Sequence, residues 1–246
     1  MAESLNPSFT PTVFAVYLFF GIMPSIIWLL FYLRRDVHPE SNQMIIKVFC
    51  YGMLIALPTC LIEMGAKETF IYLPFSDLII TLLEAFIGVA FIEEFLKYLV
   101  VREKVFDHHE LDEPIDVMLY MIISALGFAA VENILMLFSL GPILILNEAI
   151  SITIVRFVGA TFLHTLCSGS WGFFLALSFY ETEKRSRLVF AGLIMAVLLH
   201  GLYNFSIMEL GVDLQVLIPA TILSATALFF FVAFQRLRKL KSICKL

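Results

Sequence analysis

A succession of long apolar segments dominates the chain, and this feature most constrains what it can fold into. The hydrocarbon core of a bilayer is about 30 Å thick and an α-helix rises about 1.5 Å per residue, so one crossing needs roughly 20 apolar residues. A hydrophobic content of 61% and a mean hydropathy of +0.94 lie outside the range of soluble globular domains. We therefore predict an all-α, polytopic membrane protein with about seven transmembrane helices. The expected spans cover residues 11–33, 44–64, 75–100, 115–139, 157–179, 187–208 and 213–235.

Lysine and arginine are unevenly divided between the segments that connect these spans. One side of the expected bundle has Lys67 alone in its loops. The other side has Arg34, Arg35, Lys47, Arg102, Lys104, Lys184, Arg185, Arg187, Arg236, Arg238, Lys239, Lys241 and Lys245. Because cytoplasmic loops carry the excess of positive residues, the N-terminus is expected outside and the C-terminus in the cytoplasm. This orientation agrees with an odd number of spans.

The remaining segments and the composition lead to further expectations. Residues 142–155 (PILILNEAISITIV) are apolar but too short for a span, so we expect a re-entrant or interfacial element on the outer side. The first apolar segment is too long for the core of a signal peptide, and we expect it to be retained. The basic residues flank helices, which argues against nucleic-acid binding. The four cysteines show no CxxC spacing and are expected to be unpaired. Nothing in the pattern indicates an oligomeric state.

Several polar side chains fall inside the apolar segments, where an ionisable group costs at least about 2.5 kcal/mol on insertion scales. They are Glu93, Glu94 and Lys97 in the third segment, Glu132 and Asn133 in the fourth, Arg156 at the edge of the fifth and His164 within it, and His200 and Asn204 in the sixth. At about 100° per residue, Lys97 can reach either neighbouring glutamate. The other glutamate is then expected to lack a partner and to act as a general acid or base. A structural ion pair is the alternative interpretation.

The depths of these side chains suggest that they meet. Five of them fall within about 9 Å of the expected membrane midplane, namely Glu93, Glu94, Glu132, His164 and His200. We therefore predict that the paired glutamates and the two histidines converge in one cavity. His200 and Asn204 lie on one helical face, where both can donate hydrogen bonds to a single oxygen. Hydrogen bonding between helices is the alternative role for such residues.

Four blocks of these residues occur in order along the chain: Glu93-Glu94-x-x-Lys97, then Gly127-Phe-Ala-Ala-Val-Glu132-Asn133, then Arg156 with His164, and finally His200-x-x-x-Asn204. Together they resemble the PrsW family of intramembrane proteases and, more distantly, the CAAX-protease and bacteriocin-processing group. The matched core covers residues 80–208 of a single membrane domain that we expect to extend over residues 1–246. The resemblance implies a peptidase of the prokaryotic cytoplasmic membrane, with the paired glutamates and the histidines in its active site. It also implies a membrane-anchored protein or peptide as substrate, such as an anti-sigma factor.

Two mechanisms of amide hydrolysis fit these residues. In the first, Glu93 or Glu94 together with His164 takes a proton from water, while His200 and Asn204 stabilise the oxyanion. In the second, His164, His200 and Glu132 bind Zn²⁺, and one of the paired glutamates is the base. We favour the metal-free version because the zinc mechanism gives Asn204 no role. A proton-coupled transporter or channel could use the same Glu and His cluster, but we find no inverted repeat.

Overall fold

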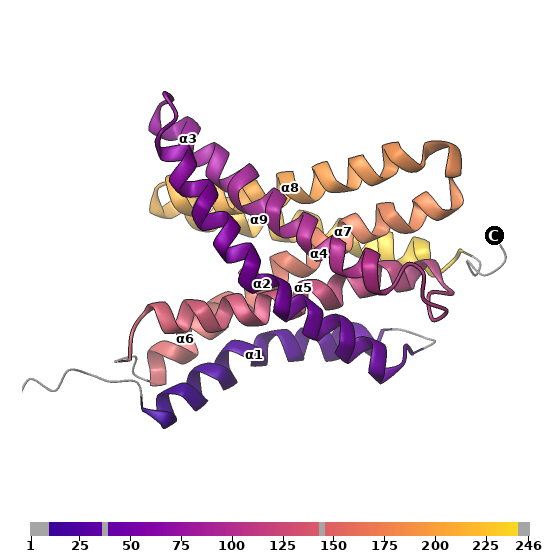
Figure 1. Ribbon diagram of the computed structural model, residues 1–246, viewed down its shortest axis with the longest axis horizontal. Helices are drawn as coiled ribbons and strands as arrows, with labels where there is room; N and C mark the ends of the chain where they lie inside the picture. Colours follow the sequence, from indigo (N-terminus) through magenta and orange to yellow (C-terminus); the bar gives the residue numbers. More distant parts are fainter. Residues whose placement is uncertain (1–9, 36–38, 143–145, 241–246) are drawn as a thin grey trace, which may run out of the picture.

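The computed structural model describes residues 10–35, 39–142 and 146–240, which are almost entirely helical and contain no strand. In chain order the elements are α1 (Pro11–Leu33), α2 (Asn42–Ile71), α3 (Asp77–Leu83), the π-helix η1 (Glu84–Phe91), α4 (Ile92–Lys104), α5 (Pro114–Ser139), α6 (Leu146–Val158), α7 (Ala160–Tyr180), the short 3₁₀ helix η2 (Thr182–Lys184), α8 (Arg185–Glu209) and α9 (Val212–Leu237). Figure 1 shows how these helices form an oblique bundle. The predicted all-α, polytopic membrane fold is confirmed.

Six helices of the described chain are long and apolar enough to cross a membrane. They are Pro11–Leu33, Asn42–Ile71, Pro114–Ser139, Asn147–Tyr180, Thr182–Glu209 and Asp213–Leu237. The stretch formed by α3, η1 and α4 runs alongside α2 in Figure 1, and it carries Glu93, Glu94 and Lys97. The seven-span count and the orientation stay predictions. In Figure 1, the α4–α5 and α7–α8 connections and the end of α9 lie at one end of the bundle, and α1 begins at the other.

The segment expected to be re-entrant lies partly outside the described residues. Its residues 146–155 belong to α6, which continues to Val158 and leads into α7 at Gly159. The sequence predicted either a re-entrant or an interfacial element here. Over the described residues, the structure shows a helix that continues into the next span, not a re-entrant loop. An interfacial position for α6 stays a prediction.

Helix α5 is the centre of the bundle, between α2 and α7. Two glycines bring α2 and α5 into direct backbone contact. A Cβ atom on Gly52 would lie 2.2 Å from the Ser124 carbonyl oxygen, and one on Gly127 would lie 2.1 Å from the Phe49 carbonyl oxygen. The Ser124 hydroxyl also donates a 3.0 Å hydrogen bond to the Lys97 carbonyl oxygen. This hydrogen bond joins α5 to α4, which carries the paired glutamates.

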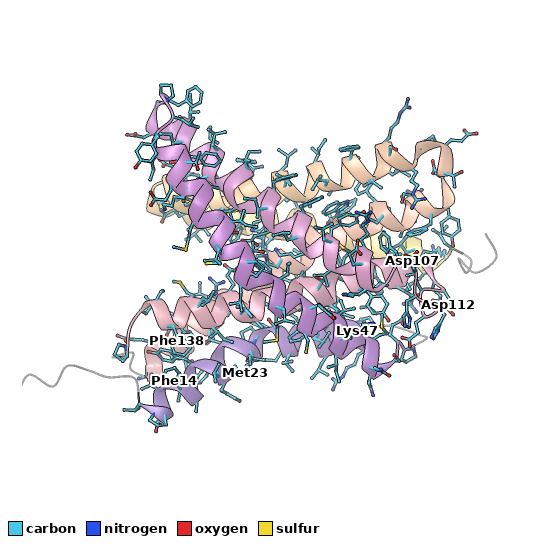
Figure 2. All side chains as sticks on the ribbon, viewed as in Figure 1. Phe14, Met23, Lys47, Asp107, Asp112 and Phe138 are labelled. Atoms are coloured by element: carbon cyan, nitrogen blue, oxygen red, sulfur yellow. The ribbon has the colours of Figure 1, made fainter. Side chains whose placement is uncertain are left out.

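The outer surface of the bundle is apolar, as contact with lipid tails requires. Large exposed side chains include Phe19, Leu61, Phe190, Leu217 and Phe231. The two ends of the bundle differ in character, as Figure 2 shows with Lys47, Asp107 and Asp112 at one end and Phe14 and Phe138 at the other. The interior is where the polar residues of the apolar segments are found.

Candidate active site

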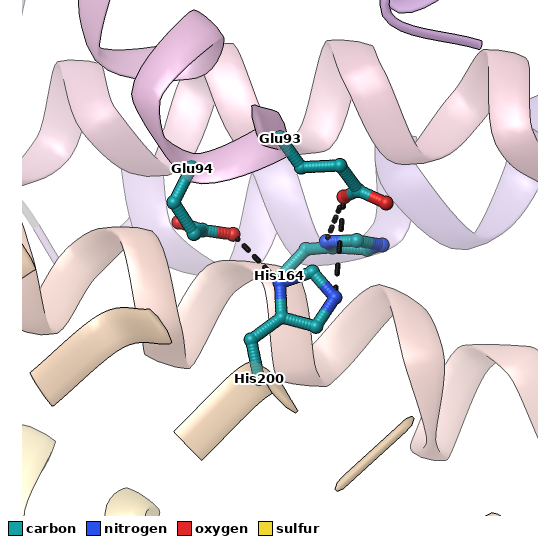
Figure 3. Close-up of side chains that lie close together, drawn as sticks. All are labelled: Glu93, Glu94, His164 and His200. Carbon is teal, nitrogen blue, oxygen red and sulfur yellow. Dashed lines mark hydrogen bonds and ion pairs between the residues drawn. The ribbon is translucent and has the colours of Figure 1, made fainter. Parts of the chain in front are cut away.

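Three helices bring the paired glutamates and both histidines together (Figure 3). Glu93 and Glu94 lie in the first turn of α4, His164 lies on α7 and His200 on α8. Glu93 is 4% exposed, Glu94 is fully buried, and each histidine is 2% exposed. The predicted convergence of these four residues is confirmed, and none of them faces lipid.

Local structure explains how α4 and α8 approach each other. The π-helix η1 immediately precedes the glutamates, and π-helical turns accompany functional sites in many proteins. Gly201, next to His200, has no side chain to separate the two elements. A Cβ atom there would lie 2.5 Å from the Phe86 ring of η1. Direct packing of η1 on α8 therefore places His200 beside the start of α4.

Lys97 is the hub of the cluster and is fully buried. Its ammonium lies 2.8 Å from Glu93 Oε2, 2.8 Å from Glu94 Oε1 and 2.8 Å from His164 Nδ1. It also lies 4.4 Å from the centre of the Phe128 ring. An ammonium group has three donors, and all three are used here. The expectation that Lys97 binds one glutamate and leaves the other is therefore wrong, because it binds both.

The two glutamates differ in the number of groups that hold them. Glu94 additionally accepts a 2.5 Å hydrogen bond from the Ser168 hydroxyl and a 3.0 Å hydrogen bond from His200 Nδ1. Glu93 Oε2 lies 3.6 Å from His164 Nδ1 and 4.0 Å from His200 Nε2, beyond ordinary hydrogen-bond distance. Glu93 is thus the less constrained carboxylate, and it is the better candidate for a general base.

His164 is held at both ring nitrogens. Its Nδ1 accepts from the Lys97 ammonium, which can only donate, so the proton of the neutral ring is on Nε2. That Nε2 atom lies 2.6 Å from Glu132 Oε2. Both nitrogens are therefore engaged, and the geometry gives His164 a positioning role beside the expected role in proton transfer.

The residues predicted to support the site form a second network around His164. Arg156 lies 3.0 Å from Glu132 Oε1, and its Nε donates to the Asn133 side-chain oxygen. Asn133 donates in turn to the Thr161 hydroxyl at 3.0 Å and to the Gly21 carbonyl at 3.3 Å. This network links α5 to α1, α6 and α7. It fixes the helix that presents His164.

Asn204 lies one turn beyond His200 on α8 and is half-buried. Within the described part of the chain, its carboxamide makes no hydrogen bond. It is thus available to a ligand, and its role as an oxyanion donor stays a prediction.

Sequence reasoning missed a further carboxyl group beside the site. Glu63 on α2 lies near Glu93, and its Oε1 is buried without a partner among the described residues. The signal was present in the sequence, because Glu63 falls inside the second apolar segment, where an ionisable residue calls for a functional explanation.

The donor types of the cluster suit a divalent metal. The ligand atoms of Glu93, Glu94, His164 and His200 all lie within 4.8 Å of one another, and imidazole and carboxylate groups are ligands of zinc. Glu132, expected as a ligand, instead binds the far nitrogen of His164, where carboxylates orient metal-bound histidines. The Lys97 ammonium, however, already contacts three of the four donor residues.

Comparisons with known proteins agree with this geometry. A family model described as the PrsW family of intramembrane metalloproteases matches residues 40–234. Proteins named Protease PrsW are similar to the chain over most of its length. The protein of Geobacillus kaustophilus is 31% identical over 75% of this chain and 76% of its own, that of Oceanobacillus iheyensis is 29% identical over 89% and 93%, and that of Bacillus subtilis is 26% identical over 81% and 86%.

No solved structure matches the chain significantly. The family match spans most of the helical bundle, including every residue of the buried cluster. The relatives are proteases of bacteria, and the described helices are those of an integral membrane protein. The chain is therefore a membrane peptidase and belongs to the PrsW family of intramembrane proteases.

Proposed function

We propose that this protease hydrolyses a peptide bond of a membrane-anchored protein with a water molecule activated by Glu93. The observation that carries the proposal is the buried cluster in which Glu93 is less constrained than Glu94. Carboxylates buried between helices are costly, and a carboxylate with spare acceptor capacity can take a proton from water. A membrane-anchored anti-sigma factor or a similar regulator is the substrate class that we propose.

In the first step, Glu93 takes a proton from water as the water oxygen bonds to the carbonyl carbon of the scissile peptide. The carbonyl π electrons move to the oxygen and form a tetrahedral oxyanion. In the second step, the oxyanion collapses, the C–N bond breaks, and Glu93 returns the proton to the leaving amine. General acid–base catalysis of this kind contributes about 10²- to 10⁴-fold to the rate.

The oxyanion is stabilised from α8. Asn204 offers an amide N–H, and His200 presents Nε2 one turn earlier. His200 Nδ1 donates to Glu94 at 3.0 Å, which orients the ring, and the proposed role requires Nε2 to carry a proton when the oxyanion forms. Lys97 keeps the two glutamates and His164 in place throughout, because it contacts all three at 2.8 Å.

The family description calls for a test of metal chemistry in the same cluster. By donor type, His164, His200 and the paired glutamates fit zinc, which would polarise the scissile carbonyl and lower the pKa of a bound water. The Lys97 ammonium lies among the same donors, so a metal ion would have to share or displace its contacts. We therefore favour the metal-free version. A transporter role draws no support from relatives that are all named proteases.

The test uses the full chain in proteoliposomes with a fluorescent reporter that contains one transmembrane helix. Cleavage is measured with and without a chelator that crosses membranes, and the metal content of the purified chain is determined by mass spectrometry. We expect cleavage that the chelator leaves unchanged. About one zinc per chain together with chelator-sensitive cleavage would replace the metal-free mechanism. Absence of cleavage across a panel of membrane-anchored reporters would contradict the proposed function.

A further inference from the structure

A half-open groove lies between α1, α7 and α9, apart from the catalytic cluster. Its volume is about 440 Å³, and none of its lining residues belongs to the cluster of glutamates and histidines. Aromatic rings from the three helices form its walls, including those of Trp28, Tyr32, Phe162, Phe230 and Phe234. Within it, Trp28 stacks on Phe162 with the ring centres 4.5 Å apart. The groove opens outward, because Phe31 and Phe231 at its edge are 43% and 60% exposed.

Two arginines line one end of this groove. Arg35 follows the last turn of α1, and Arg238 follows the last turn of α9. Both are exposed, and neither forms an ion pair with any other described residue. Arg35 lies over the Phe31 ring at 5.1 Å, which leaves its N–H groups directed at the surroundings. Two unpaired guanidinium groups at the edge of an apolar groove are complementary to an anionic amphiphile.

The position of the arginines matches the headgroup level of a bilayer. They lie where two membrane-spanning helices end, on the side predicted to be cytoplasmic. Basic pockets between helices on that side bind anionic lipid headgroups. The rings extend from there along α1 and α9, at the depth of the acyl chains.

The size of the groove favours a flexible chain over a helix. A helix with side chains is about 10 Å across, so 440 Å³ accommodates only about one turn of it. An acyl chain is thinner and can follow a narrow space between aromatic rings. We propose that this groove binds one anionic phospholipid, with an acyl chain along the rings and its phosphate between Arg35 and Arg238.

Trp28 provides a direct reporter of occupancy, because the chain has two tryptophans and the other is enclosed in the bundle. Trp171 is 1% exposed and donates to the Val189 carbonyl at 3.1 Å. The Trp171→Phe variant of the full chain is reconstituted in phosphatidylcholine bilayers that contain small fractions of a phospholipid with brominated acyl chains. Bromine quenches tryptophan at contact distance. Brominated phosphatidylglycerol is compared with brominated phosphatidylcholine at low salt.

Each arginine should contribute about five-fold to the preference for the anionic lipid. We therefore expect phosphatidylglycerol to quench Trp28 at a mole fraction at least about ten-fold lower than phosphatidylcholine does. In the Arg35→Gln/Arg238→Gln variant the two lipids should become equal. The matched control removes two exposed arginines outside the groove, Arg102→Gln/Arg187→Gln, and should retain the preference.

Several results would overturn the proposal. Equal quenching by both lipids in the parent chain would show that the arginines select nothing. A preference that persists in the Arg35/Arg238 variant, or that disappears in the control, would assign it to general surface charge. Competition by millimolar glycerol phosphate would indicate a phosphate site without a chain-binding groove, and competition by a transmembrane peptide would indicate a peptide site. In a Trp28→Phe chain, the enclosed Trp171 should show no preference, and unfolding temperatures confirm that the variants are folded.

Discussion

Replacing each of the paired glutamates by glutamine should separate catalysis from stability. Glu93→Gln removes the proposed base but disturbs only the hydrogen bond from Lys97 among the described contacts, and the Lys97 ammonium keeps Glu94 and His164. Loss of one charged hydrogen bond costs about 1.5 to 3 kcal/mol of folding free energy. The cleavage rate should fall by about 10²- to 10⁴-fold, as for loss of a general base.

Glu94→Gln should lower the stability of the fold more than Glu93→Gln does. Glu94 is fully buried and accepts from Lys97, Ser168 and His200, and glutamine brings an amide donor where these groups also donate. Breaking a buried charged network in this way costs about 3 to 5 kcal/mol. For a chain of this length, 1 kcal/mol shifts the unfolding temperature by about 2 to 4 °C. Glu94→Gln should therefore unfold several degrees below Glu93→Gln.

The assay combines thermal unfolding in detergent with reporter cleavage in proteoliposomes. The control is Glu84→Gln, which breaks an ion pair with the 59% exposed side chain of Lys67 at 3.0 Å. Such a pair contributes about 1 kcal/mol or less, so the control should retain both stability and activity. Activity of Glu93→Gln within ten-fold of the parent would refute the assignment of the base. An unfolding temperature of Glu94→Gln at or above that of Glu93→Gln would refute the difference in anchoring.

Three further changes test other parts of the site. Asn204→Ala should lower kcat by about 10²- to 10³-fold with little change in unfolding temperature, as for loss of an oxyanion donor, and an unchanged kcat would remove that role. Ser168→Ala should retain cleavage within about ten-fold, since Ser168 donates to Glu94 and is not the proposed nucleophile; a complete loss in a folded chain would indicate that its hydroxyl takes part in catalysis. Gly127→Leu should cost about 3 kcal/mol or more, because its side chain would meet the Phe49 carbonyl, and a fully stable variant would contradict the close α2–α5 contact.

The sequence predicted the helical bundle and the meeting of the glutamates with the histidines. Both follow from simple constraints, since apolar length defines a span and the cost of a buried charge singles out residues that need partners. The depth of Glu93, Glu94, His164 and His200 was enough to predict their convergence, which the structure confirms.

The details of pairing could not be predicted, because they depend on how each helix is rotated and how closely it packs. Lys97 contacts both glutamates of its own helix, and it also reaches His164 because α4 and α7 pack closely. Glu132 contacts His164 Nε2 through its Oε2 atom because its Oε1 atom is paired with Arg156. Gly159, which joins α6 to α7, lies within a continuous apolar stretch. A search for transmembrane segments in the sequence therefore does not detect this junction.

The buried cluster also governs the order in which the chain is assembled. The stretch Asp77–Lys104 carries Glu93, Glu94 and Lys97, so on its own it is a poor substrate for membrane insertion during synthesis. Its partners on α7 and α8 are translated later, because His164, Ser168 and His200 all follow it in the chain. The charges are thus fully compensated only when α8 has entered the bilayer. A nascent or truncated chain that lacks α8 is consequently without His200 and Asn204. The chain can therefore become an active protease only after α8 has been synthesised and inserted.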